Sequence, residues 1–309
     1  MQRLTRCPCC DAALGRTVPA VLAPFIRERL GIKDSTTAEL SDCGTCGFRC
    51  FVDRYEPSEI QSLYGGYRGE TYFRQRHRHE PWYTRRFNDD LGSPEAALHR
   101  NHRLASFLRE AGVLPAARSV IDWGGDRGQF IPETFSERFV YDISGVQPVP
   151  SVTALRSDDL RNRRYDLLIA AHVLEHASDP AALLRELLEI RASRIYVEVP
   201  YEPVRLPSHM QTSAWYHRWV HAVAGSRWYL PIALVSTAAR VKRVRFPPFG
   251  VLQQHEHLNY FEEATLVRLL ERVGCRVVRV VSYRRNSGSG PVEAIGALAI
   301  PPGLNRDSE

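Results

Sequence analysis

The sequence predicts an α/β fold in which helices flank a mainly parallel sheet and a small cysteine-rich module comes first. Three observations lead to this prediction. Residues 119–130, SVIDWGGDRGQF, consist of a short apolar run followed by a glycine turn. Further apolar runs then alternate with amphipathic helical patterns as far as residue 300. Six of the seven cysteines lie within the first 50 residues.

Length and composition limit the possible classes of protein. With 309 residues, the chain is long enough for one large and one small domain. Its net charge of +6 suits an acidic or phosphorylated partner but is too small to indicate nucleic acid. The first residues lack the apolar run of a secretory signal, and the apolar stretch 228–239 is too short to cross a membrane. We therefore expect a cytoplasmic protein without a transmembrane segment.

Two CxxC pairs predict a zinc-binding module over residues 1–56. The pairs are Cys7/Cys10 and Cys43/Cys46, with 32 residues between them. Two such turns bring four thiolates into a tetrahedron, which is the closed geometry of structural Zn²⁺. Cys9 is an alternative ligand to Cys10, and a redox switch is an alternative use of the thiols. Because a four-sulfur site has no open position, the metal is expected to shape the protein and not to react.

Residues 57–90 form a connecting segment that is dense in aromatic and basic side chains. One interpretation is a solvated helix with its tyrosines packed beneath it. The other is a surface for an anionic substrate, with arginines for phosphates and tyrosines for rings or sugar faces. A helix is then predicted to begin at Pro94, with Ser93 as its cap, and to open the main domain of residues 91–303.

The glycine turn predicts a nucleoside-binding site. Gly124, Gly125 and Gly128 allow the backbone to bend sharply and to approach a ligand closely. Asp122 lies in the preceding strand, and Asp142 ends the next strand, where a carboxylate can accept both hydroxyls of a ribose. The spacing is not GxGxxG and no P-loop lysine follows, which favours a nucleoside cofactor without a phosphate chain. A purely structural turn is the alternative.

More polar residues are expected at the same edge of the sheet. Asp158 or Asp159, before the predicted strand 165–171, can accept a hydrogen bond from an adenine amino group. His172 directly follows that strand and is a candidate for the cofactor site or for catalysis. The remaining predicted elements are the helix 180–190 capped by Asp179, the strand 195–199, the helix 262–273, and the strands 277–282 and 292–300.

Residues 201–260 interrupt the alternation of strands and helices. Sixty residues are long for a connection, and long insertions at the carboxyl edge of a sheet usually cover an active site. We therefore expect a lid. The alternative is an interfacial helix within 213–239 that contacts a membrane peripherally, because basic residues flank aromatic ones there.

Several motifs together resemble the class I S-adenosylmethionine-dependent methyltransferases. They are VIDWGGDRG, YDIS twenty residues later, SDDL before YDLLIAAHVLEHASDP, and the closing hairpin. The resemblance covers residues 90–300 and implies a Rossmann-like, seven-stranded sheet with S-adenosylmethionine over its first two strands. The CxxC pairs and the motif HEHLNYF resemble more narrowly the zinc-containing sugar C-methyltransferases, which act on keto-deoxysugars carried on nucleoside diphosphates. The chain departs from that pattern at Gln254, where those enzymes usually have tyrosine.

This resemblance implies that Glu256 and His257 act in catalysis. We predict that His257 is neutral at pH 7 and removes the proton next to a carbonyl, with Glu256 orienting it or holding its charge. His255 and His172 are further candidates, and a purely structural HEH run is the alternative. The predicted acceptor is a small, anionic molecule: a nucleotide-linked sugar, or a related natural-product or polysaccharide intermediate.

Two other functions are compatible with the sequence. Some RNA base methyltransferases join a zinc module to this fold, but HVLEH stands where their Asp/Asn-Pro-Pro-aromatic motif would follow the fourth strand. Nucleic acid is therefore not the expected partner. A non-catalytic zinc-ribbon adaptor is also conceivable, although the intact GGDRG turn and HEH run argue against it. The oligomeric state is not indicated by the sequence.

Overall fold

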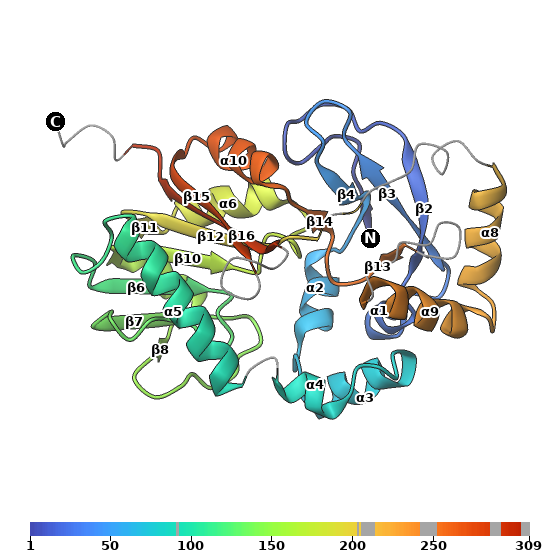
Figure 1. Ribbon diagram of the computed structural model, residues 1–309, viewed down its shortest axis with the longest axis horizontal. Helices are drawn as coiled ribbons and strands as arrows, with labels where there is room; N and C mark the ends of the chain where they lie inside the picture. Colours follow the sequence, from blue (N-terminus) through green and yellow to red (C-terminus); the bar gives the residue numbers. More distant parts are fainter. Residues whose placement is uncertain (91–92, 203, 205–213, 242–251, 285–291, 304–309) are drawn as a thin grey trace.

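The computed structural model describes residues 1–90, 93–202, 204, 214–241, 252–284 and 292–303. These residues form two halves that lie side by side, each built on its own sheet (Figure 1). One half contains a seven-stranded sheet with the strand order β15-β16-β12-β10-β6-β7-β8. The other contains a five-stranded sheet with the order β13-β2-β3-β4-β14.

The seven-stranded sheet confirms the predicted α/β fold. Its strands are β6 (Ser119–Trp123), β7 (Glu137–Tyr141), β8 (Thr153–Ala154), β10 (Leu167–Ala171), β12 (Ile195–Pro200), β15 (Arg276–Arg284) and β16 (Val292–Ile300). Neighbouring strands from β8 to β12 run parallel, whereas β16 pairs antiparallel with both β12 and β15. The closing hairpin therefore lies as predicted, while its turn at 286–290 is outside the described residues.

Helices cover both faces of this sheet. They are α5 (Pro94–Glu110) on one face, and α6 (Pro180–Leu188) and α10 (Glu263–Arg272) on the other. Successive residues of a strand point to opposite faces, so Leu167 of β10 packs toward α5 and Leu168 packs toward α6 and α10. Asp179 caps α6 as predicted, since its carboxylate accepts the backbone N–H groups of Ala181 and Ala182 at 2.9 Å.

The five-stranded sheet is larger than the predicted module of residues 1–56. Its strands are β2 (Thr17–Leu22), β3 (Thr37–Asp42), β4 (Arg49–Phe51), β13 (Gln253–Gln254) and β14 (Asn259–Tyr260). The last two come from the segment after the insertion, where β13 pairs parallel with β2 and β14 pairs antiparallel with β4. Two-stranded ladders complete the strands: β1 (Gln2–Arg3) with β5 (Asp53–Arg54), and β9 (Arg164–Tyr165) with β11 (Arg191–Ala192).

The connecting segment folds against this sheet. It forms α2 (Pro57–Tyr64), α3 (Glu70–His79) and α4 (Arg85–Asp90), of which α2 and α3 lie next to α1 (Pro24–Leu30). Tyr72 and Tyr83 are buried in one cluster with Phe25 and Leu63, so the tyrosines form a core, as one of the two interpretations expected.

The described helices of the insertion pack on the same sheet. They are α8 (Ala214–Ala224) and α9 (Tyr229–Val241), and their buried residues Tyr216 and Ala233 share an apolar cluster with Val18 and Val21 of β2. Figure 1 shows α8 on the side of this sheet that faces away from the seven-stranded sheet. α8 therefore does not form the lid predicted for residues 201–260, and residues 203, 205–213 and 242–251 of this insertion lie outside the described residues. Within the described chain, every helix is too short or too polar to cross a membrane.

Candidate functional site

The four cysteines of the CxxC pairs converge in one group. The Sγ atoms of Cys7 and Cys46 lie 3.7 Å apart, and those of Cys10 and Cys43 lie 3.6 Å apart. Four sulfurs at about 2.3 Å from a tetrahedral ion would be about 3.8 Å from one another, so the group fits a metal ion. Cys9 lies outside the group because its thiol donates to the carbonyl of Thr265 at 3.4 Å.

This group also joins the two halves. Phe48, which follows the second pair, packs on Phe261 with ring centroids 5.1 Å apart. Arg272 of α10 donates to the carbonyl of Pro8 in the first CxxC turn at 2.8 Å. The cysteine turns therefore brace the five-stranded sheet against α10.

The glycine turn lies at the carboxyl end of β6. A Cβ atom on Gly125 would lie 2.4 Å from the carboxyl group of Asp122. Gly128 has φ +72°, and its Cβ would lie 2.7 Å from Val152. Only glycine fits at these two positions, because the side chains of Asp122 and Val152 occupy the space that a Cβ atom would need. Burial raises the pKa of Asp122 to about 7.

Asp142 ends β7 and is held against this turn. Its carboxylate accepts the backbone N–H of Asp126 and that of Ser144, both at 2.8 Å. The contact with Asp126 fixes the carboxylate beside the glycine turn at the edge of the sheet. This is the position predicted for a residue that accepts the hydroxyls of a ribose.

Asp158 and Asp159 differ in position. Asp158 lines a hollow together with Trp123 and Tyr141, the last residues of β6 and β7, whose ring centroids lie 5.6 Å apart. Asp159 lines a separate hollow with Leu155. Of these two aspartates, Asp158 is therefore the one that lies beside a ring-lined space at the strand ends, which Glu186 also lines.

His172 follows β10 and is enclosed by carboxylates. Its Nδ1 lies 3.3 Å from Glu175 and its Nε2 lies 3.2 Å from Glu198, which also accepts a bond from Arg103 at 2.7 Å. Burial and Arg100 lower the pKa of His172, but the two carboxylates outweigh them and raise it. Because both ring nitrogens are engaged, His172 is suited to linking these groups and not to acting as a free base.

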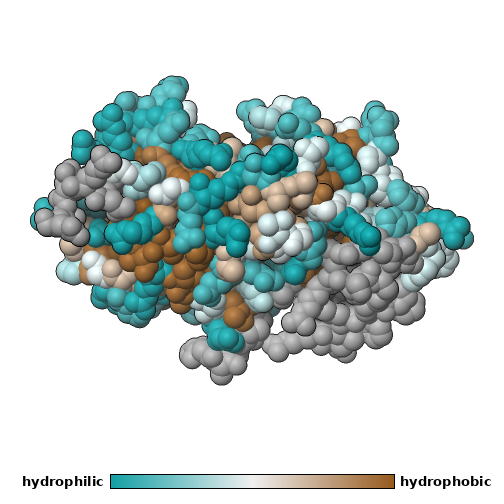
Figure 2. Space-filling view, turned by 90° about the horizontal axis from the view of Figure 1, so that it is seen from above, coloured by the Kyte–Doolittle hydropathy of each residue, from teal (hydrophilic) through white to brown (hydrophobic). Residues whose placement is uncertain are grey.

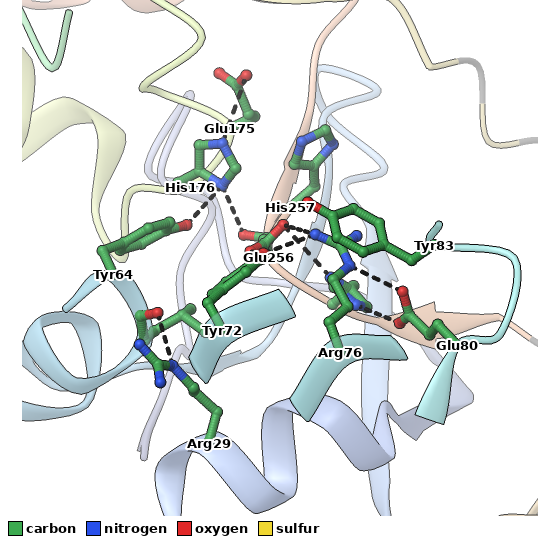
Figure 3. Close-up of polar contacts among 12 residues, drawn as sticks. Arg29, Tyr64, Tyr72, Arg76, Glu80, Tyr83, Glu175, His176, Glu256 and His257 are labelled. Atoms are coloured by element: carbon green, nitrogen blue, oxygen red, sulfur yellow. Dashed lines mark hydrogen bonds and ion pairs between the residues drawn. The ribbon is translucent and has the colours of Figure 1, made fainter. Parts of the chain in front are cut away.

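Glu256 lies at the centre of a polar cluster (Figure 3). Its carboxylate accepts bonds from the Tyr72 hydroxyl and from Arg76, the latter at 3.2 Å. Arg76 also binds Glu80, and Glu80 binds His255 at 2.6 Å. Burial would raise the pKa of Glu256, but Arg76 and the nearby histidines lower it to about 2. Glu256 is therefore charged and holds Tyr72 and Arg76 in place, while His255 is paired with Glu80.

His257 and His176 lie edge to face, with ring centroids 4.8 Å apart. The Nδ1 of His257 is 3.1 Å from the carboxylate of Glu202, so Glu202 has the orienting position predicted for Glu256. The Nδ1 of His176 is 3.0 Å from the carbonyl oxygen of Glu256 and 2.8 Å from the hydroxyl of Tyr64. Since a carbonyl only accepts, Nδ1 carries the proton of neutral His176, and the lone pair is on Nε2, which lies 3.8 Å from the carboxylate of Glu175.

The two imidazoles differ in charge at neutral pH. Burial lowers the pKa of both rings. For His257, the carboxylates of Glu202 and Glu175 outweigh burial and raise the pKa to about 9. For His176, burial and the neighbouring His257 prevail over Glu175, and the pKa falls below its ordinary value. The prediction that His257 is neutral at pH 7 is therefore wrong, because carboxylates surround it.

Glu175, His176 and His257 also bring potential metal-ligand atoms within 4.8 Å of one another. Each of these groups has an ion-pair partner: His257 pairs with Glu202, His176 lies 3.8 Å from Glu175, and Glu175 also lies 3.3 Å from His172. Ion pairing therefore accounts for this cluster, in contrast to the four thiols.

Comparison with a protein family identifies the reaction class. Residues 96–280, more than half of the chain, match the family model described as a methyltransferase domain. The chain belongs to this family. It is an S-adenosylmethionine-dependent methyltransferase, and the glycine turn with Asp142 lies in the matched region.

Solved structures resemble the chain only weakly. Magnesium protoporphyrin IX methyltransferase from Synechocystis, with bound SAH, is 14% identical over 65% of this chain and 83% of its own, with a TM-score of 0.39. A putative sarcosine dimethylglycine methyltransferase from Galdieria sulphuraria is 15% identical over 67% of this chain and 87% of its own, also with a TM-score of 0.39. These likenesses are too weak to indicate an acceptor. No curated protein matches the chain.

Sequence reasoning missed three residues of this site. Tyr64 was one of many aromatic residues in the segment 57–90. His176 was treated only as part of the motif that follows the strand 165–171. Glu202 lies at the start of the insertion, for which no role was assigned to single residues. The sequence contained one signal for His176. The run HVLEH follows a predicted strand and the run HEH precedes a predicted helix, and both runs are rich in histidine and glutamate.

Proposed function

We propose that this methyltransferase acts on a small, anionic acceptor, a nucleotide-linked keto sugar or a related intermediate, held beside His176 and His257. The observation that carries the proposal is the pair of facing imidazoles, 4.8 Å apart, each fixed by a different carbonyl or carboxylate. Residues from both halves of the molecule contribute to this cluster, as Figure 3 illustrates for Tyr64, Tyr72 and His176. A site at which residues of both halves meet suits an acceptor that the cofactor half alone would leave exposed.

In the proposed reaction, the cofactor is bound by residues at the carboxyl ends of neighbouring strands. Bound S-adenosylmethionine supplies an electrophilic methyl group. In this proposal, Asp142 binds its ribose, the backbone at Gly124 and Gly125 lies near its methionine end, and Asp158 meets its adenine. Asp122 packs against the turn, since its carboxyl group fills the space that a side chain at residue 125 would need.

The acceptor side needs a base and a positive charge. His176 takes the proton next to the carbonyl at Nε2, while Tyr64 and the Glu256 carbonyl hold the ring in place. His257, charged and held by Glu202, stabilises the negative oxygen that forms when this proton leaves. This reverses the part expected of His257 from the sequence, and it leaves Glu256 as a positioning residue.

Arg68 supports an anionic acceptor. Its guanidinium lies over the ring of Tyr67, 4.9 Å from the centroid, and its buried Nε has no hydrogen-bond partner among the described residues. Asp126 of the glycine turn lies within electrostatic reach of it. An arginine between the cofactor turn and the acceptor cluster is suited to a phosphate or carboxylate of the substrate.

We also infer that the four-cysteine group holds a structural Zn²⁺. The sulfur spacing fits the ion, and four thiolates are its preferred structural ligands. Its contribution here is to hold the two CxxC turns in the shape that contacts α10.

Replacing Asp142 with alanine should weaken S-adenosylmethionine binding about tenfold or more, because the loss of a hydrogen bond to a charged group costs about 1.5–3 kcal/mol. Isothermal titration calorimetry measures this directly. Asp159→Ala is the matched control, since Asp159 lines a different hollow. Equal affinity for wild type and Asp142→Ala would remove Asp142 from the cofactor site.

The proposed acceptor is tested with methyl-labelled S-adenosylmethionine and two panels of acceptors, nucleotide-linked sugars and RNA. We expect label in a nucleotide-linked keto sugar, detected by mass spectrometry as one added methyl group. Label in RNA would replace this proposal with the RNA alternative. Cofactor binding without transfer to either panel would contradict the proposed acceptor class.

A further inference from the structure

The outer side of α8 and α9 exposes apolar side chains that the proposed reaction does not use. Trp228 is 60% exposed, Val235 is 56% exposed and Trp215 is 50% exposed, and Leu230 and Leu234 are also exposed. Because Leu230 and Leu234 are four residues apart on α9, they share one face of the helix. We call Trp215, Trp228, Leu230, Leu234 and Val235 the insertion surface.

α9 is apolar on two sides at once. Tyr229 and Ala233 are buried toward β2, whereas Leu230, Leu234 and Val235 face outward. The sequence has no charged residue between Tyr229 and Ala239. Apolar side chains on a second face of a helix are normally covered by a further apolar surface. The outward face of α9 therefore requires a further apolar environment.

The sequence of this part of the insertion carries charge of one sign. Residues 203–255 contain seven Lys or Arg and no Asp or Glu, whereas the net charge of the whole chain is +6. The entire positive excess of the chain thus lies in this segment. Of its described members, Arg227 lies 5.6 Å from the ring centroid of the exposed Trp228, and Arg218 is exposed on α8.

We propose that the insertion surface docks on a membrane rich in anionic phospholipids. The aliphatic residues and tryptophans would enter the boundary between headgroups and acyl chains, where tryptophan is favoured, and the basic residues would meet lipid phosphates. α9 spans 13 residues, about 20 Å at 1.5 Å per residue, which suits a helix lying in this boundary. This inference is independent of the proposed acceptor.

Charge and composition favour lipid over other occupants. A second copy of this surface would bring two segments of the same positive sign together, which is unfavourable. A nucleic acid would satisfy the arginines but would leave Leu234 and Val235 without an apolar partner. An anionic bilayer satisfies both kinds of side chain.

The test is sedimentation of the full chain with vesicles. One set is phosphatidylcholine alone, and the other is an equal mixture of phosphatidylcholine and phosphatidylglycerol. We expect binding to the mixed vesicles, weakened by added salt, and much weaker binding to phosphatidylcholine. The double variant Leu234→Ser/Val235→Ser should bind at least about tenfold more weakly, since aliphatic side chains leave the apolar phase.

Two controls separate docking from unfolding. The first control is Val278→Ser, which removes an apolar side chain that is 45% exposed on β15. Figure 2 shows other apolar side chains at the surface of this half of the molecule. This variant should bind vesicles as the wild type does. The double variant should retain wild-type affinity for S-adenosylmethionine. Any of four results would overturn the proposal: no vesicle binding, equal binding to both vesicle types, unchanged binding by the folded double variant, or binding to RNA or to a second copy in place of vesicles.

Discussion

His176→Asn is expected to lower turnover by about 10²–10⁴-fold, the usual contribution of a general base. The Nε2 of neutral His176 has the lone pair, because Nδ1 donates to the carbonyl of Glu256 at 3.0 Å, and Nε2 lies 3.8 Å from the carboxylate of Glu175. Affinity for S-adenosylmethionine should stay close to that of the wild type, since the residue meets the acceptor and not the cofactor. Steady-state kinetics and calorimetry on the same variant measure both quantities.

The pH dependence separates the two histidines. The raised pKa of His257, about 9, means that its charge is present below this value and is lost as the pH rises through it. The lowered pKa of His176 means that its ring becomes charged only at a pH below the ordinary value for histidine. Wild-type activity should therefore be bell-shaped. His257→Asn should lose the alkaline limb, and His176→Asn should lose the acidic limb.

His99→Asn is a matched control, because His99 is exposed on α5 and lies outside the cluster. Near-normal turnover of His176→Asn on the true acceptor would show that His176 is not the base. A parallel loss of cofactor affinity would show instead that the histidines hold the two halves together.

The second large effect concerns the four-cysteine group. Cys43→Ser should lose the bound zinc and the folded five-stranded sheet, because structural Zn²⁺ contributes about 10–16 kcal/mol of apparent binding free energy in small zinc domains. Metal analysis and circular dichroism detect the two losses. One zinc per chain is expected for the wild type.

Cys9→Ser distinguishes this ligand set from the alternative. Cys9 bonds to the carbonyl of Thr265, and serine can make the same bond, so this variant should keep its zinc. Full metal retention in Cys43→Ser, or metal loss in Cys9→Ser alone, would contradict the assigned set.

The seven-stranded sheet was predictable because its signals are local. Strands such as β10 are buried on both faces and therefore appear as continuous apolar runs, and the glycine turn identifies the strand before it. By contrast, β13 and β14 have two residues each, which is too short for any periodicity. Their place in the N-terminal sheet depends on pairing with strands far away in the sequence.

The same distinction applies to the site. The residues proposed to bind the cofactor, from Asp122 to Asp142, lie within one strand–turn–strand unit, so the sequence predicted their place at the end of β6 and β7. The acceptor cluster depends on contacts such as that between Tyr64 and His176, which are 112 residues apart in the sequence. The charge of His257 depends on Glu202, at the other end of the insertion. No local pattern contains that information.

Direct titration of the histidine rings by NMR tests the central claim most closely, because it needs no knowledge of the acceptor. Signals are assigned by their absence in His257→Asn and His176→Asn. The arrangement predicts that the His257 ring titrates near pH 9 and the His176 ring below pH 6.5. A His257 ring that is already neutral at pH 7, or a His176 ring that is still charged there, would contradict the proposed division of charge between them.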